Sequence, residues 1–155
     1  MLFSENGGRM SSGVSKVLGP EAGKAGMLGS IGVRFMVAGA DSGGRFSLVE
    51  HPMPPRKLAA PLHRHSREAE YSFVLEGRVG ALLGDEVVYG HTGDLIFKPR
   101  GQWHAFWNAG DEPARILEII SPAGFERYFE ELLDLRSSRL TRCECDCITR
   151  LALWA

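Results

Sequence analysis

The fold of this chain is decided by residues 61–77, which read PLHRHSREAEYSFVLEG. His63 and His65 are separated by one residue, and four more residues separate His65 from Glu70. Because successive side chains of a β-strand point to opposite faces, the two histidines are expected on the same face. Two imidazoles on one face are well placed to bind the same metal ion.

A second segment supplies a further candidate ligand. Residues 93–108 read GDLIFKPRGQWHAFWN and contain His104, which can join the first pair only if its strand packs beside or across from theirs. An antiparallel barrel brings such distant segments together. Imidazole and carboxylate ligands suit one divalent transition metal: Fe, Mn, Ni, Cu or Zn. The predicted metal ligands are His63, His65, Glu70 and His104.

The spacing between the first ligands also predicts an irregularity. Glu70 lies an odd number of positions after His65, so an uninterrupted strand would turn it to the opposite face. Residues 66–69 must therefore contain a bulge or a turn. Glu68 is an alternative carboxylate, but it lies closer to His65 and does not keep the six-residue step between Glu70 and Gly77.

Each ligand also has an ordinary structural interpretation. A single histidine in a half-buried strand is more often a hydrogen-bonded residue than a ligand, and a metal here could simply hold a barrel together. Trp103, Phe106 and Trp107 are close to His104 in the sequence, and they are expected either to fill the core or to form the wall of a ligand pocket. Alternation along the strand directs His104 and Phe106 inward, so that the two tryptophans face outward or pack beneath a neighbouring strand. The agreement of four spacings favours the metal site.

Length and charge restrict the class of protein. At 155 residues, the chain is expected to form one domain with a hydrophobic core. The 18 basic and 19 acidic side chains are spread through the sequence, so no binding to nucleic acid is expected. No stretch approaches the roughly 20 apolar residues of a membrane helix, and residues 1–5 do not resemble a signal peptide. A cytoplasmic protein without membrane association is expected.

Three regions are predicted along the chain. Residues 1–30 form a flexible arm with at most a short strand, residues 31–136 a barrel with a C-terminal helix, and residues 137–155 a tail. Runs of β-forming residues at 31–38 and 45–50 predict a hairpin, after which residues 51–55 leave the sheet. Further strands are expected at 71–76, 78–83, 95–98 and 115–120, with turns at Gly77, at 84–86 and at 99–101.

The last element differs in its periodicity. Ser121 is expected to cap a helix with Pro122 in its first turn, and the helix is expected to end near residues 136–138. Its apolar face is expected to pack against the outside of the barrel. That face consists of Phe125, Phe129, Leu132 and Leu133.

The three cysteines lie close together in the tail, at Cys143, Cys145 and Cys147. They do not form a disulfide framework, because residues two apart are poorly placed for a bridge and an odd number leaves one thiol unpaired. The run also lacks the second, separated cysteine pair of a zinc ribbon. A disordered or loosely docked tail is expected.

Taken together, the two segments resemble the motifs of the cupin superfamily, in particular small single-domain bacterial cupins of quercetinase-like type. The matching residues of the first motif are His63, His65, Glu70 and Gly77. Those of the second are Gly93, Pro99, Gly101, His104 and Asn108. One departure is Lys57, where the family has a glycine. The resemblance implies an all-β fold, a double-stranded β-helix or jelly-roll barrel, to which the periodicity of the last element adds one C-terminal α-helix. It also implies a homodimer.

Function must be argued from the site, because this barrel serves many activities. Four ligands leave one or two positions of a five- or six-coordinate metal for substrate or O₂. A dioxygenase-type enzyme acting on a small chelating molecule is therefore predicted first, with Glu70 as ligand or proton acceptor. The alternatives are a sugar or keto-acid isomerase or epimerase, and a non-catalytic binder or sensor. The candidate substrate-pocket residues are Arg34, Ser72, Lys98, Arg100 and Phe106.

Overall fold

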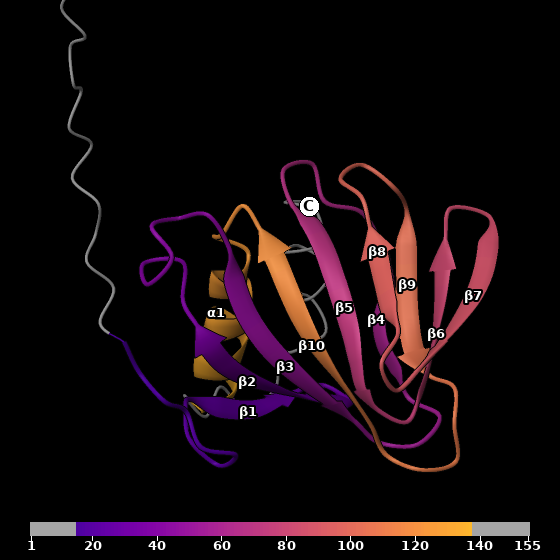
Figure 1. Ribbon diagram of the computed structural model, residues 1–155, viewed down its shortest axis with the longest axis horizontal. Coiled ribbons are helices and arrows are strands. Elements are labelled where there is room, and N and C mark those ends of the chain that lie inside the picture. Colours follow the sequence, from indigo (N-terminus) through magenta and orange to yellow (C-terminus); the bar gives the residue numbers. More distant parts are fainter. Residues whose placement is uncertain (1–14, 138–155) are drawn as a thin grey trace, which may run out of the picture.

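The computed structural model describes residues 15–137 and shows two antiparallel sheets with one C-terminal helix (Figure 1). Sheet A has the strand order β1-β2-β3-β10-β5-β8, and sheet B the order β4-β9-β6-β7. The strands of sheet A are β1 Ala25–Leu28, β2 Ile31–Val37, β3 Ser47–Met53, β5 Ala69–Glu76, β8 Leu95–Lys98 and β10 Ala114–Ser121. Those in sheet B are β4 Leu58–His63, β6 Arg78–Leu83, β7 Glu86–His91 and β9 His104–Asn108. The all-β fold with the topology of a jelly-roll barrel is confirmed.

Two apolar clusters fill the interior. The first lies between the sheets and includes Ile31, Met53, Val74, Phe106 and Ile116. The second is formed by three buried residues of sheet A, which contact side chains of the helix. Those three residues are Val33, Val49 and Ile120. Both clusters use the same face of sheet A, because Ile116 and Ile120 lie four positions apart on β10.

The helix α1, Glu126–Ser137, covers the inner face of sheet A rather than the outside of the barrel. Phe125, just before the helix, and Phe129 and Leu133 within it pack against the second apolar cluster. Figure 1 shows α1 beside β1, β2 and β3, on the side of the molecule away from β6 and β7. The expected external packing is therefore wrong. Periodicity identified the apolar face of the helix, but it does not reveal which sheet face that helix covers.

The predicted N-cap is also wrong. Ser121 is the last residue of β10, and its hydroxyl donates a hydrogen bond to the Arg45 carbonyl at 2.8 Å. The helix begins at Glu126, whose carboxylate accepts hydrogen bonds from the backbone N–H groups of Gly124 and Gly39 at 2.6 and 3.0 Å. A carboxylate in this position also complements the positive end of the helix dipole.

The strand predictions hold except at two places. First, β3 continues to Met53, so residues 51–53 stay in the sheet. The pairing between β2 and β3 stops at Glu50, so the missing N–H of Pro52 breaks no hydrogen bond between these two strands. Second, the chain turns sharply at Gly77, with φ of 81°, but β5 and β6 do not pair across this turn, because they belong to different sheets. The hairpin predicted over residues 31–50 forms as β2–β3. The expected turn at residues 84–86 connects β6 to β7, a strand that is not among those predicted.

Several predictions concern parts of the chain that the structure does not describe. The cysteine run and nearly all of the predicted tail lie outside the described residues, as does the first half of the predicted arm. Within residues 15–137, no helix is both long enough and apolar enough to span a membrane.

Asn108 joins two loops at one end of sheet B. Its side chain is fully buried, and Nδ2 lies within 3.1 Å of the carbonyl oxygens of Met53, Pro54 and Glu112. Its Oδ1 accepts a hydrogen bond from the Gly110 N–H at 2.9 Å. The turn that it supports reaches positive φ at Arg56 (56°), directly before Lys57. A glycine at position 57 is therefore not required for this turn.

We expect Asn108→Asp to lower the free energy of unfolding by about 3 kcal/mol, because a carboxylate cannot donate to these carbonyl oxygens and would be buried against them. Chemical denaturation measures the change. The control is Glu112→Gln, which replaces a carboxylate by an amide at an exposed position. It should change the free energy of unfolding by less than about 0.5 kcal/mol. Equal effects of the two substitutions would contradict this account of Asn108.

Candidate metal centre

The four predicted ligands come from both sheets. His63 ends β4 and lies opposite His104, the first residue of β9, in sheet B. Glu70 is the second residue of β5 in sheet A. His65 lies in the segment that connects the sheets. The site is therefore built where the chain crosses from one sheet to the other.

The predicted irregularity before Glu70 is confirmed. β4 ends at His63, residues 64–68 are not in a strand, and β5 begins at Ala69. The carbonyl of His65 accepts a hydrogen bond from the Gly101 N–H at 2.8 Å, which holds this connection against the turn after β8. This connection allows His65 and Glu70 to face the same point although they differ in strand parity.

Two of the imidazoles are oriented by hydrogen bonds to the backbone. His63 Nδ1 lies 2.7 Å from the carbonyl oxygen of Pro61, and His104 Nδ1 lies 2.9 Å from that of Gln102. Since a carbonyl only accepts, each Nδ1 carries a proton, and in the neutral ring Nε2 then keeps its lone pair. This is the tautomer that a metal-binding histidine needs, with its second nitrogen fixed by a hydrogen bond.

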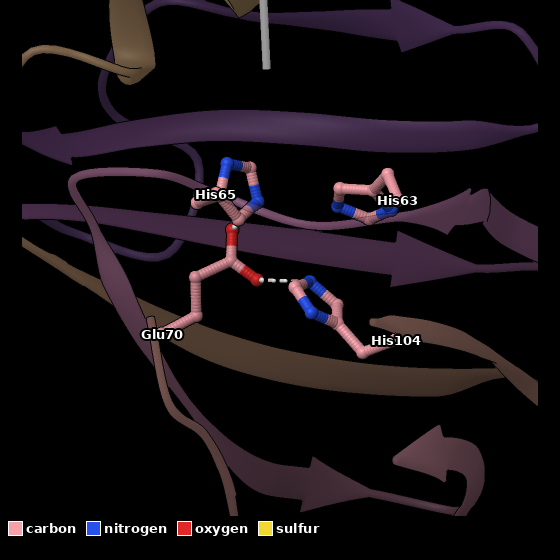
Figure 2. Close-up of side chains that lie close together, drawn as sticks. All are labelled: His63, His65, Glu70 and His104. Carbon is pink, nitrogen blue, oxygen red and sulfur yellow. Dashed lines mark ion pairs between the residues drawn. The ribbon is translucent and has the colours of Figure 1, made fainter. Parts of the chain in front are cut away.

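The four side chains converge on one point, as Figure 2 shows. Glu70 Oε1 lies 3.2 Å from His65 Nε2, and Glu70 Oε2 lies 3.3 Å from His104 Nε2. One ligand atom from each of the four residues lies within 4.8 Å of the others. His63, which is half-buried, is the most accessible of the four, and the other three are buried.

This arrangement fits a metal ion. The Nε2 atoms of His65 and His104 are buried, and among the described residues they make no well-aligned hydrogen bond, although the Glu70 oxygens lie 3.2 and 3.3 Å away. Such buried polar atoms are costly unless another group binds them. Ligand atoms around one ion lie at most about 4.2 Å apart at metal–ligand distances of ~2.1 Å, so only small side-chain shifts are needed. Burial lowers the pKa of His63 to about 4, so this imidazole is neutral and able to bind a metal at neutral pH.

A layer of buried polar groups surrounds the ligands. Lys98 Nζ lies 2.8 Å from Glu70 Oε2 and 3.0 Å from Glu118 Oε1, and Glu118 also accepts a hydrogen bond from the Ser72 hydroxyl. His51 lies on the same inner face, where its Nδ1 donates to the Gly32 carbonyl at 2.9 Å. This layer lies between the two apolar clusters on β3 and β10, whereas Leu28 packs against both clusters.

Sequence reasoning missed Glu118 and His51. The strand 114–121 directs Ala114, Ile116, Glu118 and Ile120 to the same face, so a charged residue among apolar inward positions was the available signal. His51 was assigned to a segment outside the sheet. Knowledge that β3 continues to Met53 would have placed His51 on the inner face.

The candidate pocket residues divide into two groups. Ser72, Lys98 and Phe106 are buried on the inner faces beside the ligands. Arg34 lies on the outer face of sheet A, where it forms an ion pair with Glu50. Arg100 is exposed in the turn after β8. The structure therefore does not bring the two arginines to the metal centre.

Both tryptophans lie outside the barrel interior. Trp103 is 48% exposed, and the Arg64 guanidinium lies 5.0 Å from its ring centroid. Trp107 covers Gly80 on the outer face of sheet B and lines a shallow depression of about 430 Å³, whose lining includes none of the four ligands. The aromatic contact to the centre comes instead from Phe125, whose ring centroid lies 4.3 Å from that of His65.

Comparisons with known proteins are consistent with this geometry. A family model described as a cupin domain matches residues 50–120, and no curated protein matches significantly. The polyketide cyclase RemF from Streptomyces resistomycificus is 28% identical, with a TM-score of 0.61 over 70% of this chain and 80% of that chain. KdgF from a Halomonas species is 14% identical, with a TM-score of 0.64 over 74% of this chain and 99% of its own. A predicted oxalate decarboxylase from Thermotoga maritima is 20% identical, with a TM-score of 0.57 over 59% and 80% of the respective chains.

The buried His51 predicts how stability depends on pH. Burial lowers its pKa to about 4, so the folded chain takes up this proton less readily than the unfolded chain, whose histidine has a pKa near ~6.5. His51 therefore has no effect on stability above that pH and favours unfolding as the pH falls from about 6.5 to 4.

Between pH 7 and pH 5, we expect the free energy of unfolding of the metal-free wild type to fall by about 2 kcal/mol more than that of the His51→Gln variant. The glutamine retains a donor for the Gly32 carbonyl but does not titrate. Denaturation in the presence of a chelator measures both slopes, and the contribution of His63 is common to the two proteins. Parallel slopes would show that His51 does not titrate in this way.

Proposed function

This chain belongs to the cupin superfamily, and from that premise we propose that it is a metal-dependent enzyme acting on a small chelating molecule. The observation that carries the proposal is the convergence of three imidazole nitrogens and one carboxylate on one buried point. The residues that would hold the metal are His63, His65, Glu70 and His104. A divalent transition metal bound there would supply Lewis-acid or redox chemistry at the coordination positions that these residues leave open.

The protein groups define how a substrate would approach. Three ligands are buried and His63 is half-buried, so we place the substrate on the His63 side of the centre. Phe106 and Phe125 provide apolar surface near the ligands. A compact molecule with two neighbouring oxygen atoms, such as a hydroxy-ketone or a diketone, matches a metal with open positions beside an apolar wall.

We favour dioxygenase-type chemistry as the reaction. The acid–base groups nearest the ligands are already paired: Lys98 with Glu70 and Glu118, and Glu118 with Ser72. Of the reactions considered, metal-dependent oxidation has the least need of a free acid or base side chain, because the metal would supply the redox chemistry. Glu70 itself is held ionised: burial would raise its pKa, but the Lys98 ammonium and the neighbouring imidazoles lower it well below its usual value.

Ring closure of a polycarbonyl chain is the second candidate. It is supported by the 28% identity with RemF, which is a polyketide cyclase. This reaction also begins from a molecule with neighbouring carbonyl groups and needs no O₂. The isomerase or epimerase alternative has less support, because Arg34 and Arg100 do not reach the centre and Lys98 is already neutralised by two carboxylates.

We expect protein purified without added metal or chelator to contain about one transition-metal ion per chain, measured by mass spectrometry. His104→Ala should lose this metal, because it removes one of four ligands. His91→Ala is the matched control: this histidine is exposed on β7 and should leave the metal content unchanged. Wild-type protein that takes up no transition metal under any loading condition would overturn the proposed function.

Oxygen uptake by the metal-loaded protein distinguishes the reactions. With a panel of diketones and hydroxy-ketones, consumption of O₂ that is lost in His104→Ala supports the dioxygenase. Conversion of a polycarbonyl substrate without O₂ consumption supports ring closure instead. Binding of these molecules without turnover of any of them would identify a binder or sensor and contradict the enzymatic proposal.

A further inference from the structure

Three charged side chains are buried together beneath the proposed metal centre. Glu70, Lys98 and Glu118 are each at most 4% exposed. They come from three neighbouring strands, β8, β5 and β10, in which Glu70 lies opposite Lys98 and Glu118 lies opposite Ser72. Burying charges is costly unless they are paired, so this cluster indicates a specific role.

The Lys98 ammonium lies between the two carboxylates. Its Nζ is 2.8 Å from Glu70 Oε2 and 3.0 Å from Glu118 Oε1, and it lies 4.3 Å from the centroid of the Phe106 ring. Glu118 is itself held by the Ser72 hydroxyl, whose Oγ is 2.9 and 3.0 Å from its two carboxylate oxygens. Every polar group behind Glu70 is therefore fixed by another one.

Only Glu70 of the two carboxylates reaches the imidazoles. Its Oε1 faces His65, while Oε2 lies between His104 and the Lys98 ammonium. The contact to Lys98 thus determines how the carboxylate plane is turned toward the point where the four ligands meet. We propose that Lys98, anchored by Glu118 and Ser72, is a positioning residue that orients Glu70 for metal binding. This inference rests on the proposed function, because it requires that the four ligands bind a metal.

The charges of the cluster agree with this role. Burial would lower the pKa of Lys98, but the Glu118 and Glu70 carboxylates raise it, so the ammonium remains charged. Burial and the nearby Glu70 charge raise the pKa of Glu118 to about 7, despite the opposing effect of Lys98.

The test separates orientation from charge. Removing Lys98 alone would take away a positive charge, which by itself favours binding of a cation. The double variant Lys98→Met/Glu118→Gln removes one charge of each sign, so the net charge of the pair is unchanged at pH 8. Buried ion pairs are often replaced by neutral side chains without loss of stability, so the double variant is expected to fold.

We expect the double variant to bind Co²⁺ about 10- to 100-fold more weakly than the wild type, because loss of an outer partner of a metal ligand typically has this effect. The visible absorption of bound Co²⁺, which reports the coordination geometry, should also change. Equal Co²⁺ affinity and an unchanged spectrum would overturn the positioning role, although the proposed function would stand. Failure of the wild type itself to bind Co²⁺ would overturn both.

A milder variant provides a second test that does not depend on the folding of the first. Ser72→Ala keeps every charge but removes the hydrogen bond that holds Glu118, so Co²⁺ binding should weaken severalfold and the spectrum should shift in the same direction. Thr92→Ala removes an exposed hydroxyl from the turn between β7 and β8 and should change neither. If Ser72→Ala behaves like Thr92→Ala, Glu118 is not an anchor.

Discussion

The ion pairs of one buried ammonium organise the interior of this barrel. Lys98 lies between Glu70 and Glu118, and the polar layer formed around it lies between the apolar cluster of the two sheets and the cluster beneath the helix, which meet at Leu28. Charged groups in such a place must be paired with good geometry. The three strands that carry them are therefore held in one register, and so is the carboxylate that faces the imidazoles.

The position of the site follows from how the chain connects the two sheets. His63 and His104 lie opposite each other in sheet B, whereas Glu70 belongs to sheet A. His65 lies on the connection between them. Neither sheet alone holds the full set of ligands, so the centre forms only when the sheets pack. Phe125 then places the helix against His65 and covers one side of the site.

The chemistry of the site limits which class of substrate could bind more closely than it limits which reaction could follow. Imidazoles held by backbone carbonyl groups, together with one ionised carboxylate, form a ligand set that suits a transition metal, and His63 is the most accessible of the four side chains. Both favoured reactions, oxidation by O₂ and ring closure, start from molecules with neighbouring oxygen atoms. The likeness to RemF and the pairing of Lys98 and Glu118 are the observations that bear on the choice between them.

The sequence by itself determined most of the strands, the grouping of His63, His65, Glu70 and His104, and the irregularity before Glu70, because these depend on spacing and on the two-residue period of a strand. Only the tertiary structure decided that α1 covers the inner face of sheet A, and that Arg34 lies on the outer face, away from the centre. The same holds for the partnership of Lys98 with Glu118, which are 20 residues apart on strands separated by β5. Such contacts depend on which strands become neighbours and on which sheet faces are covered, and these are properties of long-range packing.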